Sequence, residues 1–396
     1  MASQDTLHAS DPARVSWMND PKVRGIIFQV LVVAILSAAV YWIWGNTVEN
    51  LRRANISSGY GFLNGRSGFD VSQSLIEFNA DSTFGRAIIV GLLNTVLVAV
   101  VGVITATILG FLIGIGRLSG NWLIAKICMV YVEVFRNIPP LLVIFFWYLG
   151  VLSVLPGPRD SIELPFGSYL NSRGFFLPKA LWEEGAWVIP LAIVVAIIAI
   201  FAIARWSYKR QMKTGERFPV LLTAIALILG LPTLAALATG IPFTFEYPQQ
   251  GAFNLTGGSQ IKPEFLSLYL ALSFYTAAFI AEIVRAGILG VSRGQTEAAN
   301  ALGLRSGPTL RLIVVPQAMR IIIPPLTSQY LNLTKNSSLA VFVGYPDLVQ
   351  IGQTTMNQTG QAIEVVSIWM LIYLGLSLST SLFMNWFNDR MALVER

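Results

Sequence analysis

Long apolar runs recur along the chain and dominate its pattern. A helix that crosses a membrane needs about 20 mostly apolar residues, because the hydrocarbon core is about 30 Å thick. Eight runs of this length are present, and they cover approximately residues 25–44, 87–115, 124–154, 186–204, 219–239, 265–285, 321–344 and 364–386. The third and seventh also contain polar residues and prolines. In lipid the backbone must satisfy its own hydrogen bonds, so the pattern predicts an all-α membrane protein with about eight transmembrane helices.

The charges between the runs predict which side of the membrane each segment faces. The segments 205–217 and 285–320 each hold five basic residues and one acidic residue, whereas 46–86, 156–185 and 241–263 mix the two signs. Lysine and arginine accumulate in cytoplasmic loops. With an even number of spans, both termini are expected in the cytoplasm, and no cleavable signal peptide is expected before the first run.

Composition agrees with this picture and excludes several classes of protein. Hydrophobic residues make up 54% of the 396 residues, and charged residues only 12%, against about 25% in a soluble domain. The formal net charge of +6 follows the cytoplasmic loops, so a bilayer and not nucleic acid is the expected partner. One cysteine, Cys128, and one histidine, His8, exclude a disulfide framework and leave a zinc site nearly impossible, so no metal is expected. No phosphate-binding P-loop motif is present.

The segment 292–320 is neither short nor featureless. Ser292 and Gln295 have the spacing of a capping box, and Gly303 ends the helix that they begin. A second short helix starts near Pro308, and Pro316 is expected to interrupt it. Two short helices joined by a glycine turn, between two spans, predict a compact docking element.

The residues of this segment resemble the E-A-A…G…I-x-L-P motif of ABC importer permeases, with Val315 where leucine is usual. In that family the helix pair sits in a cleft of the cytoplasmic ATPase. The resemblance therefore assigns coupling to the positions that match the motif, which are Glu297, Ala298, Ala299, Gly303 and Pro316.

The resemblance extends over about 87–155 and 263–390, and there it is similar to the polar-amino-acid branch of these permeases. The matching segments include Gly91-Leu92-Leu93-Asn94-Thr95, Glu133-Val134-Phe135-Arg136-Asn137, Ala281-Glu282-Ile283-Val284-Arg285 and Lys335-Asn336-Ser337-Ser338. The layout resembles the larger membrane subunit of general L-amino-acid or glutamate/glutamine/aspartate/asparagine importers.

This layout implies four regions along the chain. A cytoplasmic tail, an extra span and a periplasmic loop occupy 1–86. The first part of a five-helix permease core occupies 87–155, and an insertion with periplasmic loops and two extra spans occupies 156–262. The second part of the core, which carries the coupling helices, occupies 263–396.

The resemblance also implies partners and a location. It implies a second permease subunit, with a heterodimer favoured, two cytoplasmic ATPase subunits that hold ATP and Mg, and a periplasmic amino-acid-binding protein. The location is the bacterial inner membrane, and the chain itself would hold no cofactor and be no enzyme. The alternative is a secondary amino-acid transporter driven by an ion gradient. Such transporters usually show inverted repeats and broken helices in both halves, and here no repeat is visible.

Polar residues inside the seventh run are candidates for the substrate path, because such groups are costly at membrane depth. Gln329, Asn332 and Asn336 fall on one helix face, and Lys335 flanks them. The lysine ammonium could hold a substrate α-carboxylate. It could instead pair with an internal carboxylate such as Glu133 or join helices together.

Five other positions are weaker candidates. Glu133 and Arg136, three residues apart on the third run, either pair with each other or line the path, just before prolines that are expected to bend the helix. Asn94 is a further candidate for the path. Glu282 and Arg285, near the cytoplasmic end of the sixth run, suit gating or structural roles better than substrate binding.

Overall fold

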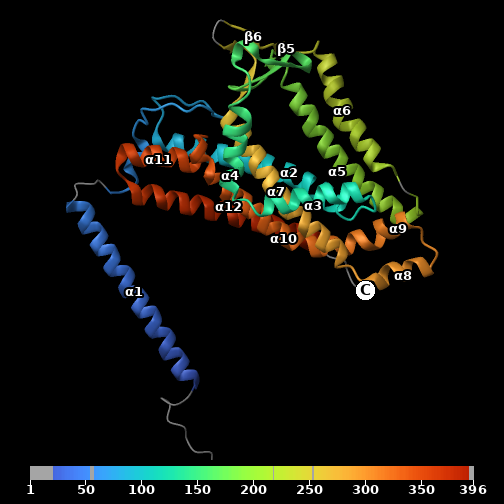
Figure 1. Ribbon diagram of the computed structural model, residues 1–396, viewed down its shortest axis with the longest axis horizontal. Coiled ribbons are helices and arrows are strands. Elements are labelled where there is room, and N and C mark those ends of the chain that lie inside the picture. Colours follow the sequence, from blue (N-terminus) through green and yellow to red (C-terminus); the bar gives the residue numbers. More distant parts are fainter. Residues whose placement is uncertain (1–20, 54–57, 217, 252–253, 392–396) are drawn as a thin grey trace, which may run out of the picture.

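The computed structural model describes residues 21–53, 58–216, 218–251 and 254–391, and these residues are predominantly helical (Figure 1). The expected N-terminal tail, including His8, lies outside the described residues. The helices are α1 (Pro21–Arg53), α2 (Phe84–Gly116), α3 (Trp122–Arg136), α4 (Pro140–Phe145), α5 (Val188–Thr214), α6 (Val220–Ala238), α7 (Pro263–Leu289), α8 (Arg293–Ala301), α9 (Ser306–Thr309), α10 (Val315–Asn336), α11 (Leu348–Thr359) and α12 (Ala362–Met391).

Seven helices of the described chain are long and apolar enough to span a membrane, and a bent pair could form an eighth span. The expectation of about eight spans is therefore confirmed. The third run is not one straight helix, because α3 and the helix that starts at Pro140 meet at a bend of 110°. This bend confirms the prediction that Pro139 and Pro140 bend the helix. At the break, the Asn137 side chain donates a hydrogen bond to the Glu133 carbonyl at 2.6 Å.

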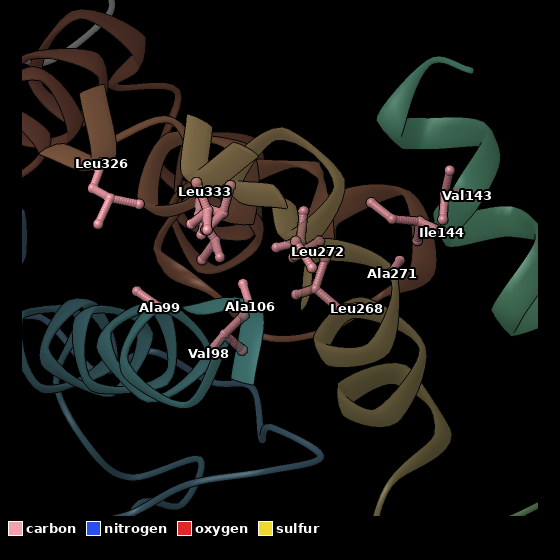
Figure 2. Packing of buried hydrophobic residues seen from close by; sticks show 14 of the residues in the cluster. Val98, Ala99, Ala106, Val143, Ile144, Leu268, Ala271, Leu272, Leu326 and Leu333 are labelled. Carbon is pink, nitrogen blue, oxygen red and sulfur yellow. The ribbon is translucent and has the colours of Figure 1, made fainter. Parts of the chain in front are cut away.

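The core forms where α2 and α7 pack along each other and α10 and α4 close the remaining sides. Small residues permit this close packing, as at Gly110, where a Cβ atom would lie 2.5 Å from Ile280 Cγ2. Figure 2 shows Val98 and Ala106 of α2 facing Leu272 of α7 and Leu333 of α10. The hydrophobic cluster therefore joins helices from both parts of the predicted core.

Three helices lie outside this core. α5 and α6 pack on each other as a hairpin, and α1 stands apart; none of the three makes an extended contact with the core helices (Figure 1). Their apolar side chains are exposed, as expected of surfaces that face lipid. The segment after α1 is nevertheless tied to α12, because Gly59 N–H donates to Glu364 Oε1 at 2.7 Å and Tyr60 Oη lies 2.7 Å from Ser367 Oγ.

The insertion also contains β-structure that the sequence patterns did not predict. β1 (Ile162–Leu164), β2 (Ser168–Asn171), β3 (Gly174–Leu177) and β8 (Ser259–Ile261) form an antiparallel sheet in that order. β4 (Lys179–Trp182) pairs with β5 (Phe243–Glu246), and β6 (Gln249–Gln250) pairs with β7 (Leu255–Thr256). These strands lie at the end of the α5–α6 hairpin that is remote from α8 and α9 (Figure 1). The chain is thus predominantly helical, as expected, and the strands are short and confined to these loops.

Candidate functional site

The two short helices predicted for 292–320 are present as α8 and α9, and a glycine turn joins them. Gly303 has φ +74°, its N–H donates to Asn300 O at 2.9 Å, and the Leu304 N–H donates to Ala299 O at 3.1 Å. This pair of bonds is a Schellman motif, which needs a left-handed residue at the position of Gly303. The predicted role of Gly303 in ending the first helix is confirmed.

The predicted capping box is wrong, although Ser292 is the N-cap of α8. The Ser292 side chain makes no capping hydrogen bond, and its backbone oxygen accepts from Gln295 N–H at 3.0 Å. Gln295 Oε1 instead accepts a hydrogen bond from Gln317 Nε2 at 3.2 Å. Because Gln295 reaches forward to the start of α10, it ties α8 to the following span and does not reach back to the cap.

The outer face of α8 is left uncovered by the described chain. Glu297 and Ala298 are exposed, and Leu302 is 81% exposed. Ala299 is buried, where α8 packs on α9 and the turn that follows it. Of the two alanines predicted to lie close to a partner, only Ala298 is therefore available to one.

Pro316 does not interrupt its helix, and this expectation is wrong. The chain runs as one helix over Ser306–Val343, with a π-helical turn over Leu310–Val314 in which Val315 N–H donates to Leu310 O. A proline lacks the N–H of the regular ladder and its ring crowds the preceding turn. The wider π turn just before Pro316 accommodates both effects, so the helix continues into α10.

One face of α10 is polar and uncovered. We define the α10 strip as Ser328, Asn332 and Lys335, all of which are exposed, with Gln329 and Asn336 half-buried at its edge. The opposite face of α10 is apolar and packs into the core through Ile322, Ile323, Leu326 and Leu333. The structure therefore places the four predicted residues of this run together, at the surface of the subunit and not in its interior.

The suggested pair between Lys335 and Glu133 is not formed. No ion pair of either side chain occurs in the described part of the chain, and Glu133 is exposed on α3. The Lys335 side chain is instead exposed on the α10 strip.

A cluster of charges surrounds Glu282 near the end of α7. Its carboxylate pairs with Arg117, with Arg285 at 2.5 Å and with Arg136 at 3.8 Å. The suggested Glu133–Arg136 pair is therefore wrong, because Arg136 reaches Glu282 and lies over the Phe279 ring at 5.7 Å. One carboxylate joins α2, α3 and α7, which is the geometry of a structural clamp.

Asn94 is fully buried between α2 and the start of α11. Its Nδ2 donates to Pro346 O at 2.8 Å and to Gln73 O at 3.0 Å, and its backbone oxygen accepts from Tyr345 Oη at 3.2 Å. These contacts hold a loop and a helix start together, so the geometry suits a structural role for Asn94 better than contact with a substrate.

The same region holds a buried carboxyl group, that of Asp347. Its Oδ1 caps α11 by accepting from Gln350 N–H at 2.8 Å, and Oδ2 has no hydrogen-bond partner among the described residues. Burial raises the pKa of Asp347 from 3.8 to about 7, against the lowering effect of backbone hydrogen bonds.

This raised pKa predicts a dependence of stability on pH. The folded state keeps the proton up to about pH 7, whereas the unfolded state releases it near pH 4, so stability falls as pH rises between these values and is level above them. Asp347→Asn keeps an acceptor for the cap and cannot ionise. We expect the melting temperature of the wild type to fall more steeply than that of Asp347→Asn between about pH 5 and about pH 7. Parallel curves would contradict the burial of an ionisable carboxyl here.

Three important side chains were missed by the sequence analysis. Arg117 closes the short turn between two apolar runs, and its charge at a helix end was the available signal. Ser328 lies four residues before Asn332, so helical spacing could have added it to the strip. Asp347 gave no signal, because an aspartate after a span is expected to be solvated.

Comparison with known proteins identifies membrane transport proteins as relatives of this chain. Residues 189–393 match a family described as the binding-protein-dependent transport system inner membrane component. The chain is 63% identical over 390 residues to the general L-amino acid transport system permease protein AapQ of Rhizobium johnstonii, and the match covers 98% of both chains. It is 43% identical over 425 residues to the glutamate/glutamine/aspartate/asparagine transport system permease protein BztB of Rhodobacter capsulatus, over 98% of this chain and 99% of that one. The chain therefore belongs to the family of binding-protein-dependent transport system inner membrane components.

Proposed function

We propose that this chain is a permease subunit of an ATP-driven importer of polar L-amino acids in a bacterial inner membrane. The observation that carries the proposal is the α10 strip, a polar face on a span whose lysine forms no ion pair within the described ranges. Polar groups cannot face hydrocarbon at acceptable cost. A second permease subunit that covers the strip would convert it into one wall of an enclosed path.

The chemistry of the strip suits an amino acid. The ammonium of Lys335 offers a charge-assisted hydrogen bond to an α-carboxylate, and the amides of Asn332 and Gln329 offer both donors and acceptors. The relatives named for L-amino acids and for glutamate, glutamine, aspartate and asparagine support this class of substrate. A related but different second subunit, and hence a heterodimer, is part of the proposal.

The docking element provides the link to ATP. In the proposed orientation both termini and α8 face the cytoplasm, because the basic excess lies in 205–217 and 285–320. Glu297, Ala298 and Leu302 would then contact an ATPase subunit. ATP and Mg would be bound there, so this chain would need no cofactor and would catalyse no reaction.

The other end of the molecule would receive the substrate. The strands of the insertion cap the α5–α6 hairpin at the end remote from α8 (Figure 1). In the proposed orientation they face the periplasm, where an amino-acid-binding protein would dock. A secondary transporter needs no partner on the α8 side, and the exposed Leu302 therefore favours the ATP-driven importer.

Substitution of the docking carboxylate tests this proposal. Glu297→Gln removes one charge from the exposed face of α8, and removal of one partner of an interfacial charge pair costs about 2–5 kcal/mol. We expect the stimulation of ATP hydrolysis by loaded binding protein to fall about tenfold or more. The measurement is the ATPase rate of the reconstituted complex.

The matched control is Glu216→Gln, which changes an exposed carboxylate in the segment after α5 whose ion pair with Arg210 lies at the surface. Such surface pairs contribute little, so this variant should behave as the wild type. Equal stimulation in Glu297→Gln and wild type, with the complex intact, would remove Glu297 from the docking surface.

A further inference from the structure

We propose that a hollow at the α2–α3 turn binds the phosphate headgroup of an anionic phospholipid. The hollow has a volume of about 390 Å³, and its wall includes Arg117, Lys126, Arg285 and Trp122. It lies at the ends of α2 and α7 that carry the Glu282 cluster, on the same side of the molecule as α8.

The charges around the hollow do not balance. Three guanidinium groups, those of Arg117, Arg136 and Arg285, share the single carboxylate of Glu282. Lys126 adds a fourth positive charge, and it takes part in no ion pair within the described residues. Among the residues that line the hollow, Arg117, Lys126 and Arg285 are therefore cations and none is acidic, and the Arg117 side chain is only 12% exposed. A partly buried excess of this sign attracts an anion.

The shape of the site distinguishes a lipid from a small anion. Trp122 is 74% exposed beside the hollow, and Leu123 and Ile127 are exposed on the same helix. Tryptophan prefers the membrane interface, and exposed aliphatic side chains on a membrane helix face acyl chains. A phospholipid would place its headgroup over the cations and its acyl chain along the apolar side chains of α3. Free phosphate or a free amino acid would contact only the cations.

The depth of the site also fits a headgroup. Arg117 is the C-cap of α2, and Arg285 lies in the last turns of α7. Both helices are long enough to span the bilayer, so these charges lie near one interface. Basic pockets between membrane helices on the cytoplasmic side are a known mode of binding for lipid headgroups.

The headgroup contact is tested by measuring lipid binding to the purified chain. The probes are phosphatidylglycerol and phosphatidylcholine with identical acyl chains, compared by native mass spectrometry. We expect preferential binding of phosphatidylglycerol, and a loss of about five- to tenfold in its affinity in Lys126→Gln. Lys126 makes no ion pair with Glu282, so this variant should leave the structural clamp intact. Lys209→Gln, which changes an exposed lysine on α5, is the matched control and should bind as the wild type.

Several results would overturn the proposal. Equal binding of the two lipids, or unchanged affinity in Lys126→Gln, would exclude a headgroup site in this hollow. Displacement of phosphatidylglycerol by millimolar inorganic phosphate would identify a small-anion site, and displacement by glutamate would identify a carboxylate site. The measurement requires no transport, so its outcome is independent of whether the chain imports amino acids.

Discussion

Replacement of Gly110 by leucine is expected to abolish the packing of α2 against α7. A Cβ atom at Gly110 would lie 2.5 Å from Ile280 Cγ2 and 3.1 Å from Ala277 O. One turn later, a Cβ atom at Gly114 would lie 2.7 Å from Ala281 O. Two helices this close cannot admit a larger side chain unless their backbones separate. Overpacking of this kind costs about 1–3 kcal/mol in soluble cores, and small residues are the main basis of close helix packing in membranes.

The measurement is the yield and the melting temperature of the purified protein. We expect Gly110→Leu to give little folded protein and a melting temperature well below that of the wild type. Gly230→Leu is the matched control, because it makes the same change in the middle of α6, where a Cβ atom would meet nothing within 4 Å. A wild-type melting temperature for Gly110→Leu would show that α2 and α7 are not packed as described.

Replacement of Lys335 by alanine is expected to reduce amino-acid uptake about tenfold or more. The ammonium is exposed on the α10 strip and has no ion pair in the described part of the chain. A hydrogen bond to a charged group contributes about 1.5–3 kcal/mol, which corresponds to about 10- to 100-fold in binding. The loss should be smaller for Lys335→Arg, which keeps the charge.

Uptake into cells or proteoliposomes is measured together with recovery of the whole complex. Lys209→Ala, a change at an exposed lysine of α5, should leave uptake unchanged. Normal uptake kinetics in Lys335→Ala would exclude Lys335 from the substrate path. A disassembled Lys335→Ala complex would show instead that the lysine holds the two permease subunits together.

The helices of this fold could be predicted because membrane insertion depends on properties that are local in sequence. Run length and hydropathy identified the spans, and the proline pair at Pro139 identified the bend after α3. The β3–β8 pairing could not be predicted, because partners such as Phe176 and Gln260 lie 84 residues apart. The β3–β8 pairing forms because the α5–α6 hairpin brings the two strands together, and no local sequence pattern predicts that arrangement. The β1–β2 and β2–β3 hairpins are local and were missed. The prediction that Pro316 interrupts its helix was wrong, because the π turn before it accommodates the missing N–H and the bulk of the proline ring.

Those features of the candidate site that depend on local sequence could also be predicted, and its contacts between helices could not. Helical spacing brought Asn332 and Lys335 to one face, and the left-handed turn at Gly303 followed from residue type. The partner of Arg136 did not follow, because Glu282 reaches it across the packed interface between α3 and α7. Nearest neighbours in sequence are poor guides to ion pairs when another helix offers a carboxylate. The burial of Ala299 depends likewise on how α8 packs on its own continuation.

Reconstitution of transport is the most direct test of the central claim. The complex purified through this chain is placed in proteoliposomes, with loaded binding protein on one side and ATP on the side that carries α8. The account predicts uptake of labelled L-amino acid that requires both ATP and binding protein, and that is unaffected when ion gradients are collapsed. Uptake by this chain alone, driven by an ion gradient without ATP, would contradict the account and would establish a secondary transporter.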